Sequence, residues 1–419
     1  MQTRREFIRN GLGLVSLGIA LPTTLLDATR VLAADAPARR NGKILVVIEM
    51  AGGNDGLNTV SPLNNPLYAK NRPGIGHKIG DALAIDRDLF LHPNMKALKT
   101  LYEKGNLAVV NGVGYPNPNR SHFASMDIWQ SGNIEIDARE RSGWLARFDA
   151  QGHFTGDQKA LSMVATGGSL PLALWSESSA ASVIGNGTSF GFDPRGNDGN
   201  AQIETLKTLY DAQDLSGATV AGGSRAFLSN VGQEVYASTD AIKAALRAYD
   251  SKAGQKAEYP RGSELAESLQ TVAKLIAGGL PTRVYYVSMG GFDTHSNQNQ
   301  SHAYLLGQLA GGLAAFQEDL RLQGRDVDVL TMTFSEFGRR VKENGSGGTD
   351  HGSASMMFVA GGAVKGGVVG DYPSLEDLDD GDLKMTTDFR SVYATVLGNW
   401  MNSDPKAVLG DDFKRLAFA

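Results

Sequence analysis

Cysteine is absent from the 419-residue sequence, and this absence excludes several kinds of chemistry at once. Disulfides, thiolate metal sites, cysteine-bound iron–sulfur clusters and c-type haem attachment all require cysteine. No G-x-G-x-x-G motif follows a predicted strand, so a redox enzyme is disfavoured as well. Heptads and internal repeats are also missing, and neither a coiled coil nor a repeat architecture is expected.

Positive charge is not in excess either. The formal net charge is -5 at pH 7, and it becomes -7 when residues 1–33, which carry four arginines and two acidic residues, are removed. A mildly acidic protein does not attract nucleic acid or an anionic membrane through its overall field. We therefore expect no nucleic-acid partner.

The N-terminal segment resembles a twin-arginine export signal. Residues 3–9 read TRREFIR, no charge follows until Asp27, and small residues stand at 31–34. This order of a basic region, an apolar region and small residues predicts a cleaved signal peptide over residues 1–33. A membrane anchor fits less well because the apolar run is short and is interrupted by glycines and a proline. We expect export by the twin-arginine translocase, a periplasmic or secreted location, and no stable membrane span after cleavage.

Glycine is abundant, with 51 of 419 residues against a usual share of about 7%. Buried-strand patterns alternate with helical patterns along the chain, which predicts an α/β fold with a mostly parallel sheet covered on both faces. No linker interrupts residues 41–419, so we expect one domain, with a helical side layer at about 200–280. Strands are expected within residues 43–50, 106–114, 159–168, 170–175, 282–295, 327–340 and 354–362.

Polar side chains follow the predicted strands, in the loops where such sheets place their functional residues. Four of the seven histidines lie in or near these loops. Carboxylates combined with neutral imidazoles suit Zn²⁺, Mn²⁺ or Fe, whereas carboxylates alone suit Mg²⁺ or Ca²⁺. The candidates are Asn54, Asp55, Asn58, Arg120, Ser121, His122, Asp293, His295, His302, Glu336, Asp350 and His351.

Several of these residues also have a structural interpretation. Asp55 in Asn-Asp-Gly is typical of a turn. Ser121 stands where a helix N-cap is expected, although caps and nucleophiles can coincide because helix N-termini bind phosphate and sulfate. His122 can be a surface histidine. Asp293 and His295 share one face of an extended segment, and a structural role fits that pairing as well as a ligand role does.

The polar residues of two further loops are harder to explain by packing alone. Glu336 follows a buried strand, where an unpaired carboxylate is costly. Asp350 and His351 lie side by side in a Gly/Ser-rich loop before another buried strand. We expect this pair to close a metal-centred site built by loops from at least four strands. The remaining histidines, interpreted as structural, are His77, His92 and His153.

Seven motifs follow one another in a fixed order along the chain: GGNDGLNTVSP, RSHFASMDIWQSG, GGFDTHSNQ, FSEFGRR, DHGSASMMFVAGG, GDYP and TDFRSVYATVL. This order resembles the exported bacterial family catalogued as domain of unknown function 1501. The resemblance covers nearly the whole mature chain, and that family is grouped with the alkaline phosphatase and sulfatase superfamily. It implies a three-layer α/β sandwich with a two-metal site at the strand ends and a nucleophile at a helix N-terminus.

The resemblance also implies roles for individual residues. Ser121, with its neighbour His122, takes the catalytic position. The metal ligands would be Asp55, Asp293, His295, Glu336, Asp350 and His351. Three features depart from the superfamily pattern: an Asp-x-His spacing at 293–295, a phenylalanine at 337 where a ligand histidine is usual, and no Cys-x-Pro-x-Arg signature.

Two functions follow from this interpretation. The first is a metal-dependent hydrolase of phosphate or sulfate esters that holds one or two ions of Zn, Mn, Fe or Ca. Its Ser121 would attack a small anionic ester whose oxygens are bound by Asn54, Asn58, Arg120 or Arg339. The alternative is a non-catalytic exported binding or assembly protein with a degenerate site, which the missing ligand histidine favours.

Overall fold

A computed structural model describes residues 42–135, 142–152, 161–177, 181–185, 238–249 and 257–419. The predicted signal peptide and the first part of the predicted helical side layer, up to residue 237, lie outside these ranges. Within the described part of the chain, no helix is long and apolar enough to cross a membrane.

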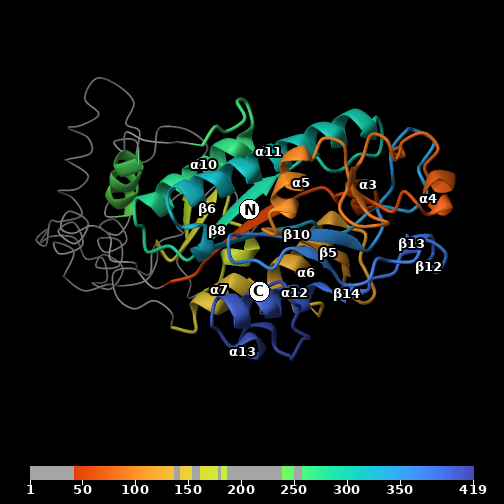
Figure 1. Cartoon of the computed structure of the whole chain (residues 1–419). Helices are drawn as coiled ribbons and strands as arrows, with labels where there is room; N and C mark the ends of the chain where they lie inside the picture. The colour runs from red at the N-terminus through yellow and green to blue at the C-terminus, as the bar shows by residue number, and fades with distance from the viewer. Residues whose placement is uncertain (1–41, 136–141, 153–160, 178–180, 186–237, 250–256) are drawn as a thin grey trace, which may run out of the picture.

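The centre of the molecule is a nine-stranded sheet (Figure 1). Its strand order is β11-β5-β10-β9-β1-β8-β6-β7, with β14 also paired to β5. Every pairing is parallel except the two made by β10. The predicted mostly parallel sheet is thus confirmed. The strands are β1 Ile44–Met50, β5 Leu107–Gly114, β6 Met163–Thr166, β7 Ser182–Ile184, β8 Val284–Met289, β9 Val329–Phe334, β10 Ser355–Ala360, β11 Gly367–Val369 and β14 Thr387–Asp388.

Strand β1 shows why the sheet needs cover on both faces. It is buried along its whole length between β8 and β9. Because successive side chains point to opposite faces, Val46 and Ile48 enter one core layer while Leu45 and Val47 enter the other. A continuous apolar run is the sequence signature of such a doubly covered strand.

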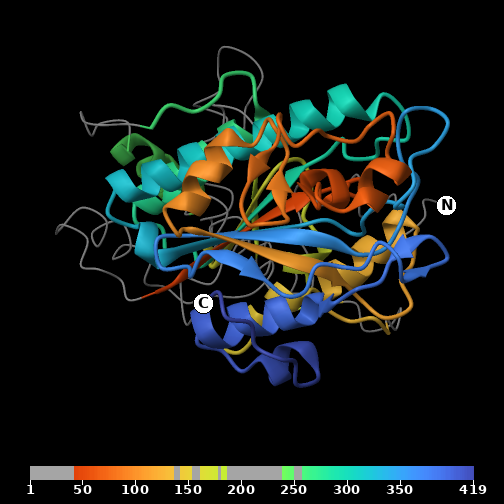
Figure 2. The ribbon, with the colours of Figure 1, turned by 45° about the vertical axis from the view of Figure 1, so that its right-hand side comes forward.

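Two groups of helices supply this cover and make three layers (Figures 1 and 2). Helices α5, α10 and α11 pack on the Val46 face, and α6, α7, α12 and α13 pack on the Leu45 face. The predicted helices on both faces are therefore confirmed. The bounds are α5 Lys96–Glu103, α10 Glu264–Ala277, α11 Gln298–Leu322, α6 His122–Ser131, α7 Trp144–Asp149, α12 Phe389–Thr395 and α13 Pro405–Leu409.

Short elements surround the end of the sheet where the parallel strands finish. Helices α3 and α4 follow β1, and the β12–β13 hairpin precedes β14 (Figure 1). Three short strands form a separate sheet in the order β2-β4-β3. The bounds are α3 Gly56–Thr59, α4 Pro66–Asn71, β2 Val60–Ser61, β3 Leu83–Ala84, β4 Phe90–Leu91, β12 Leu378–Asp379 and β13 Asp382–Leu383.

One predicted strand is wrong. Residues 170–175 form a 3₁₀ turn at Leu172–Leu174 after Pro171 instead of a strand. Ala173 and Leu174 are buried, so the apolar pattern reports burial and not extended backbone. Of the predicted helical layer at about 200–280, residues 238–249 are helical and α10 follows them, while the rest lies outside the described residues.

Candidate metal centre

Three segments bring polar side chains to the carboxyl end of the sheet. His122 is the first residue of α6, which follows β5, and Asp293 and His295 follow β8. Asp350 and His351 come before β10, which runs opposite to its neighbours. The start of an antiparallel strand lies where the parallel strands end, and this places the two residues beside the others.

Asp293 lies at the centre of three imidazoles. Its Oδ1 atom is 3.0 Å from Nε2 of His295 and 3.2 Å from Nε2 of His351. These two imidazole nitrogens are themselves 2.9 Å apart. The Nε2 atom of His122 lies 3.6 Å from Asp293 Oδ2, which is too far for a hydrogen bond. All three histidines therefore direct Nε2 toward one carboxylate.

The other ring nitrogen of each histidine faces an oxygen that can only accept a hydrogen bond. His122 Nδ1 lies 2.7 Å from Glu336 Oε1, and His351 Nδ1 lies 2.9 Å from the Arg120 carbonyl oxygen. His295 Nδ1 lies 3.2 Å from an Asp350 carboxylate oxygen. Each neutral ring then donates from Nδ1 and keeps a lone pair on Nε2.

The lone pairs of His122 and His351 and the Asp293 carboxylate lie close enough to share one cation, and the His295 lone pair adjoins Asp293 and His351. The ligand atoms of His122, Asp293 and His351 all lie within 4.8 Å of one another. Nε2 of His122 is buried and makes no hydrogen bond. Partial burial lowers the pKa of His351, which favours the neutral imidazole that binds metals. The donor set fits Zn²⁺, Mn²⁺ or Fe²⁺.

Arg339 fixes the central carboxylate. Its buried guanidinium donates to the carbonyls of Gly53 (2.7 Å), Thr349 (2.9 Å) and Phe292 (3.1 Å), and to Asp293 Oδ1 at 2.7 Å. Burial alone would raise the pKa of Asp293, but the bond from Arg339 and the nearby positive charge bring that pKa to about 2. Arg339 thus holds Asp293 ionised, and its donors are occupied by the protein instead of pointing to a substrate.

Glu336 supports a histidine from behind. Its carboxylate accepts from the Gly52 N–H at 2.9 Å and from the Ser335 hydroxyl at 3.1 Å, in addition to His122 Nδ1. The structure therefore places this predicted ligand on the far side of the His122 ring from Nε2. Phe337 packs its ring 4.8 Å from the ring centres of both His122 and His351.

The residues predicted after β1 lie apart from these histidines. Asp55 is fully buried in an ion pair with Arg72 and also accepts from Gln298. Asn54 lies 2.9 Å from His302 Nε2 through its side-chain oxygen. Asn58 donates to the Ile75 carbonyl and accepts from Tyr68. These contacts direct all three side chains to the interior of the protein. The loop contacts the centre instead through the Gly52 N–H, which donates to Glu336.

The two remaining predicted residues lie at the edge of the centre. Ser121 is exposed at the N-cap position of α6, and its side chain makes no capping bond. The Arg120 guanidinium is about one-third exposed and donates to Asp382 at 2.8 Å and to Asp380 at 3.4 Å. Both residues are accessible, and the hydroxyl stands next to His122.

Two features have no counterpart in the sequence-based prediction. Gln298, at the start of α11, accepts from the hydroxyls of Thr294 (3.1 Å) and Thr349 (2.6 Å), and so joins the loops that carry the histidines. The rings of His77 and His92 lie 4.5 Å apart, and those of His92 and His302 lie 5.9 Å apart. Each of these clusters includes residues that are far apart in the sequence, so no local motif predicts it.

Fold and site together define an α/β protein with a histidine–carboxylate centre at the carboxyl ends of a mostly parallel sheet. The chain belongs to the family described as "Protein of unknown function (DUF1501)", which matches residues 42–411. A search of the curated proteins finds no match.

Several solved structures are similar at low identity. A protein in the alkaline phosphatase superfamily from Vibrio parahaemolyticus is 8% identical, with 93% of this chain and 79% of that chain covered and a TM-score of 0.38. The periplasmic domain of EcEptC from Escherichia coli is 11% identical, with 91% and 90% covered and a TM-score of 0.37. The lipoteichoic acid synthase LtaP from Listeria monocytogenes is 9% identical, with 87% and 81% covered and a TM-score of 0.34. Likenesses at these scores carry no argument about activity.

Proposed function

We propose that the protein is a metal-dependent hydrolase of phosphate or sulfate esters. The observation that carries this proposal is the convergence of three Nε2 atoms on the Asp293 carboxylate. His122, His295, His351 and Asp293 would hold one divalent ion. A bound ion would supply positive charge to an ester's oxygens. The proposed ligand set omits Asp55, Glu336 and Asp350, whose carboxylates make the contacts described above.

Ser121 is the proposed nucleophile. Its hydroxyl is exposed at the N-terminus of the ten-residue helix α6, beside the His122 ring. Free backbone N–H groups at a helix N-terminus favour a phosphoryl or sulfuryl group placed there. The serine hydroxyl would lose its proton to water, and its oxygen would bond to phosphorus or sulfur as the bond to the alcohol oxygen breaks and that oxygen takes up a proton. Water would then displace the serine oxygen, releasing phosphate or sulfate and restoring the hydroxyl. Arg120, which is partly exposed, is the proposed contact for the anion.

A non-catalytic binding protein is the second candidate. The donors of Arg339, Asn54 and Asn58, which the sequence predicts as anion contacts, are directed to other protein groups, that of Asn54 to the Met356 sulfur. This arrangement favours a protein that keeps the centre and has lost the means to bind an ester. The two candidates share the metal and differ in turnover.

Metal content is the first test. Protein purified without chelator should contain about one equivalent of Zn, Mn, Fe or Ca by elemental mass spectrometry. His351→Ala should lose most of it, whereas His77→Ala, in the buried histidine cluster, should retain it. A wild-type protein with no metal would reject the ligand assignment.

Turnover is the second test. The metal-loaded protein should hydrolyse 4-nitrophenyl phosphate or 4-nitrophenyl sulfate, and Ser121→Ala should abolish that activity while the metal content stays the same. Ser403→Ala, which removes a hydroxyl bonded to Gln151, provides a serine control outside α6. Full activity of Ser121→Ala would reject the nucleophile, and bound metal without turnover would favour the binding protein.

We further propose that the chain is exported by the twin-arginine translocase to the periplasm or beyond. The TRREFIR motif at residues 3–9 and the small residues at 31–34 support this proposal. Replacing Arg4 and Arg5 by lysine should retain the full-length precursor in the cytoplasm. N-terminal sequencing of the wild-type periplasmic protein should start close to residue 34, and a precursor found only in the cytoplasm would contradict export.

A further inference from the structure

An exposed carboxylate lies between two arginines near the centre. Nη1 and Nη2 of Arg120 each lie 3.4 Å from Asp380 Oδ2, and Nη2 of Arg340 lies 3.2 Å from the same atom. Asp380 stands in the turn between β12 and β13, and its side chain is 77% exposed. Two guanidiniums that share one carboxylate oxygen have the charge and the geometry of a site for an oxyanion.

Both arginines are joined to the proposed metal ligands through their main chain. Arg120 directly precedes Ser121, and its carbonyl accepts from Nδ1 of His351 at 2.9 Å. The Arg340 N–H donates at 3.0 Å to the carbonyl of Asp350, the residue before His351. The two backbones therefore flank His351, and their guanidiniums belong to the surroundings of the centre.

A second carboxylate of the hairpin is held much more firmly. The Asp382 side chain is 2% exposed, and its Oδ2 accepts from Arg120 Nε at 2.8 Å and from Nη2 at 2.6 Å. A buried charge that loses its partner is costly, so Asp382 stays in place. The bonds to Asp380 are longer and exposed to water, and such ion pairs contribute little. Asp380 is therefore the carboxylate that another anion can replace.

The turn allows the Asp380 carboxylate to leave while the hairpin stays intact. Asp380 has φ +50° and Gly381 has φ +87°, as a two-residue type I′ turn requires. The main chain has bonds of its own, because the Asp380 carbonyl accepts from Arg340 Nη1 at 2.9 Å and the Gly381 carbonyl accepts from the Val341 N–H at 3.4 Å. Only the side-chain torsions of Asp380 need to change.

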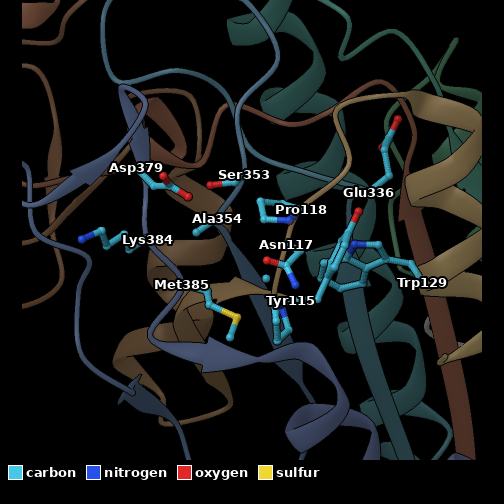
Figure 3. Close-up of a pocket in the computed structure, with 12 residues that line it drawn as sticks. Tyr115, Asn117, Pro118, Trp129, Glu336, Ser353, Ala354, Asp379, Lys384 and Met385 are labelled. Atoms are coloured by element: carbon cyan, nitrogen blue, oxygen red, sulfur yellow. The ribbon is translucent and has the colours of Figure 1, made fainter. Parts of the chain in front are cut away.

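The side of the hairpin next to the loop after β5 is not tightly packed. A cavity of about 160 Å³ lies there, and Figure 3 shows Lys384 and Met385 on one side of it, with Asn117 and Pro118 of the loop opposite. Because Asp380 is exposed and the hairpin borders a cavity, its side chain can turn to water without displacing packed core residues.

We propose that Arg120 and Arg340 form a site for a tetrahedral oxyanion, sulfate or phosphate, and that Asp380 occupies this site until the oxyanion displaces it. This inference rests on the proposed function, which takes Arg120 as the contact for the anion. It adds Arg340 as a second arm and Asp380 as a competing group. The oxyanion is either the ester group of a substrate or the free ion that hydrolysis releases, since both present the same oxygens to the arginines.

The competition by Asp380 can be measured without turnover. The full chain, purified without chelator, is titrated with sodium sulfate at constant ionic strength and followed by calorimetry. Asp380→Asn and Asp380→Gly both suit the positive φ, and each should raise the sulfate affinity about three- to tenfold, as expected when two exposed ion pairs no longer compete. Asp377→Asn removes the same charge from a residue that is 72% exposed and pairs with Lys384. Its effect, through long-range charge alone, should stay below about twofold.

The second arm is tested from the arginine side. Arg340→Gln should weaken sulfate binding about fivefold or more, because it removes a charged donor. Arg321→Gln is the matched control, since Arg321 is an exposed arginine that pairs with Glu318 on α11. Its sulfate affinity should equal that of the wild type. This pair keeps the test decisive if the Asp380 variants alter the turn.

Kinetics distinguishes the two sources of the oxyanion. A lower KM for 4-nitrophenyl sulfate or phosphate in Asp380→Gly, with kcat unchanged, would assign the site to the ester group. A higher sulfate affinity with an unchanged KM would assign it to the free ion. Both results support the site.

The outcomes also separate this inference from the proposed function. No sulfate binding in Asp380→Gly, equal affinities in Asp380→Gly and Asp377→Asn, or wild-type affinity in Arg340→Gln would overturn the site and leave the hydrolase intact. Sulfate binding that responds to these substitutions in a protein that hydrolyses no ester would support the site and reject the hydrolase.

Discussion

Nδ1 of His122 lies 2.7 Å from Oε1 of Glu336, and this contact joins the start of α6 to the loop after β9. Because Glu336 only accepts at this point, it fixes the His122 ring with its Nε2 lone pair toward Asp293. The carboxylate is itself held by the Gly52 N–H. The orientation of one proposed ligand therefore depends on two loops that supply none of the proposed ligands.

Glu336→Gln should weaken metal binding about ten- to hundredfold, because the amide can donate to Nδ1 and so favour the wrong tautomer. Competition with a chromophoric chelator measures the change. Glu343→Gln is the matched control, since Glu343 accepts from the backbone N–H groups of Gly74 and Ile75. Unchanged affinity in Glu336→Gln would remove Glu336 from the support of the centre.

Arg339→Ala should lower the free energy of unfolding by about 3 kcal/mol, because it leaves several buried carbonyls without a donor. Arg340→Ala removes a neighbouring guanidinium that is one-third exposed and pairs with Asp380, and it should cost no more than about 1 kcal/mol. Urea denaturation of the two variants gives the comparison. Equal losses of unfolding free energy in the two variants would show that the buried bonds of Arg339 stabilise the fold no more than the exposed bonds of Arg340 do.

Gly52→Ala should lower the stability of the fold by more than the strained backbone angle at this position alone would cause. Gly52 has φ +119°, and a Cβ there would lie 2.5 Å from the Asp293 nitrogen. Gly167 has a similar φ of +128° with open space around it, so Gly167→Ala isolates the cost of backbone strain, about 1–3 kcal/mol. The melting temperature of Gly52→Ala should lie well below that of Gly167→Ala, and metal content should fall only in Gly52→Ala. Equal stabilities would contradict the close approach of these loops.

The buried histidines predict a pH dependence. Burial lowers the pKa of His92 to about 3 and that of His302 to about 4, both below the unfolded value near 6.5. Between pH 6.5 and pH 4 the unfolded chain binds more protons, so stability is full above pH 6.5 and is lost as the pH falls through this window. His302→Gln should reduce the slope by up to about 1.4 kcal/mol per pH unit.

Urea denaturation of wild type and His302→Gln at pH 7, 6, 5 and 4 measures this difference. Carboxylates titrate in both proteins, so only the difference between the two curves reports the histidine. Parallel curves would show that His302 is not held neutral in the folded protein.

The sequence predicts the layers and the sheet well because both depend on repeated patterns. A continuous apolar run such as that of β1 predicts a buried strand without information from the rest of the chain. The loop after β8 was expected at the carboxyl edge of the sheet, whereas the loop before β10 lies there only because β10 is antiparallel, a direction that no sequence pattern predicted. The structure brings Asp293, His295 and His351 together at this edge. These expectations required no knowledge of individual contacts.

The orientation of single side chains could not be predicted in this way. Asp55 directly follows β1, but Arg72, seventeen residues later, takes its carboxylate into the interior. Glu336 carries the chemistry of a ligand, and only the ring orientation of His122 shows which face of the imidazole it holds. Such choices depend on partners far along the chain, which no local spacing marks.

The bonds of Arg339 have a consequence for the order of events during synthesis. This side chain reaches carbonyls at residues 52 and 53, at 292 and at 349, so partners more than 280 residues apart in sequence meet at one guanidinium. Contacts of such separation form late in folding, since long loops must close first. A nascent chain that has not reached Arg339 has neither the ionised Asp293 nor the closing His351. Only the finished chain can therefore assemble the proposed ligand set, whereas partly made chains carry its histidines at separate places along the sequence.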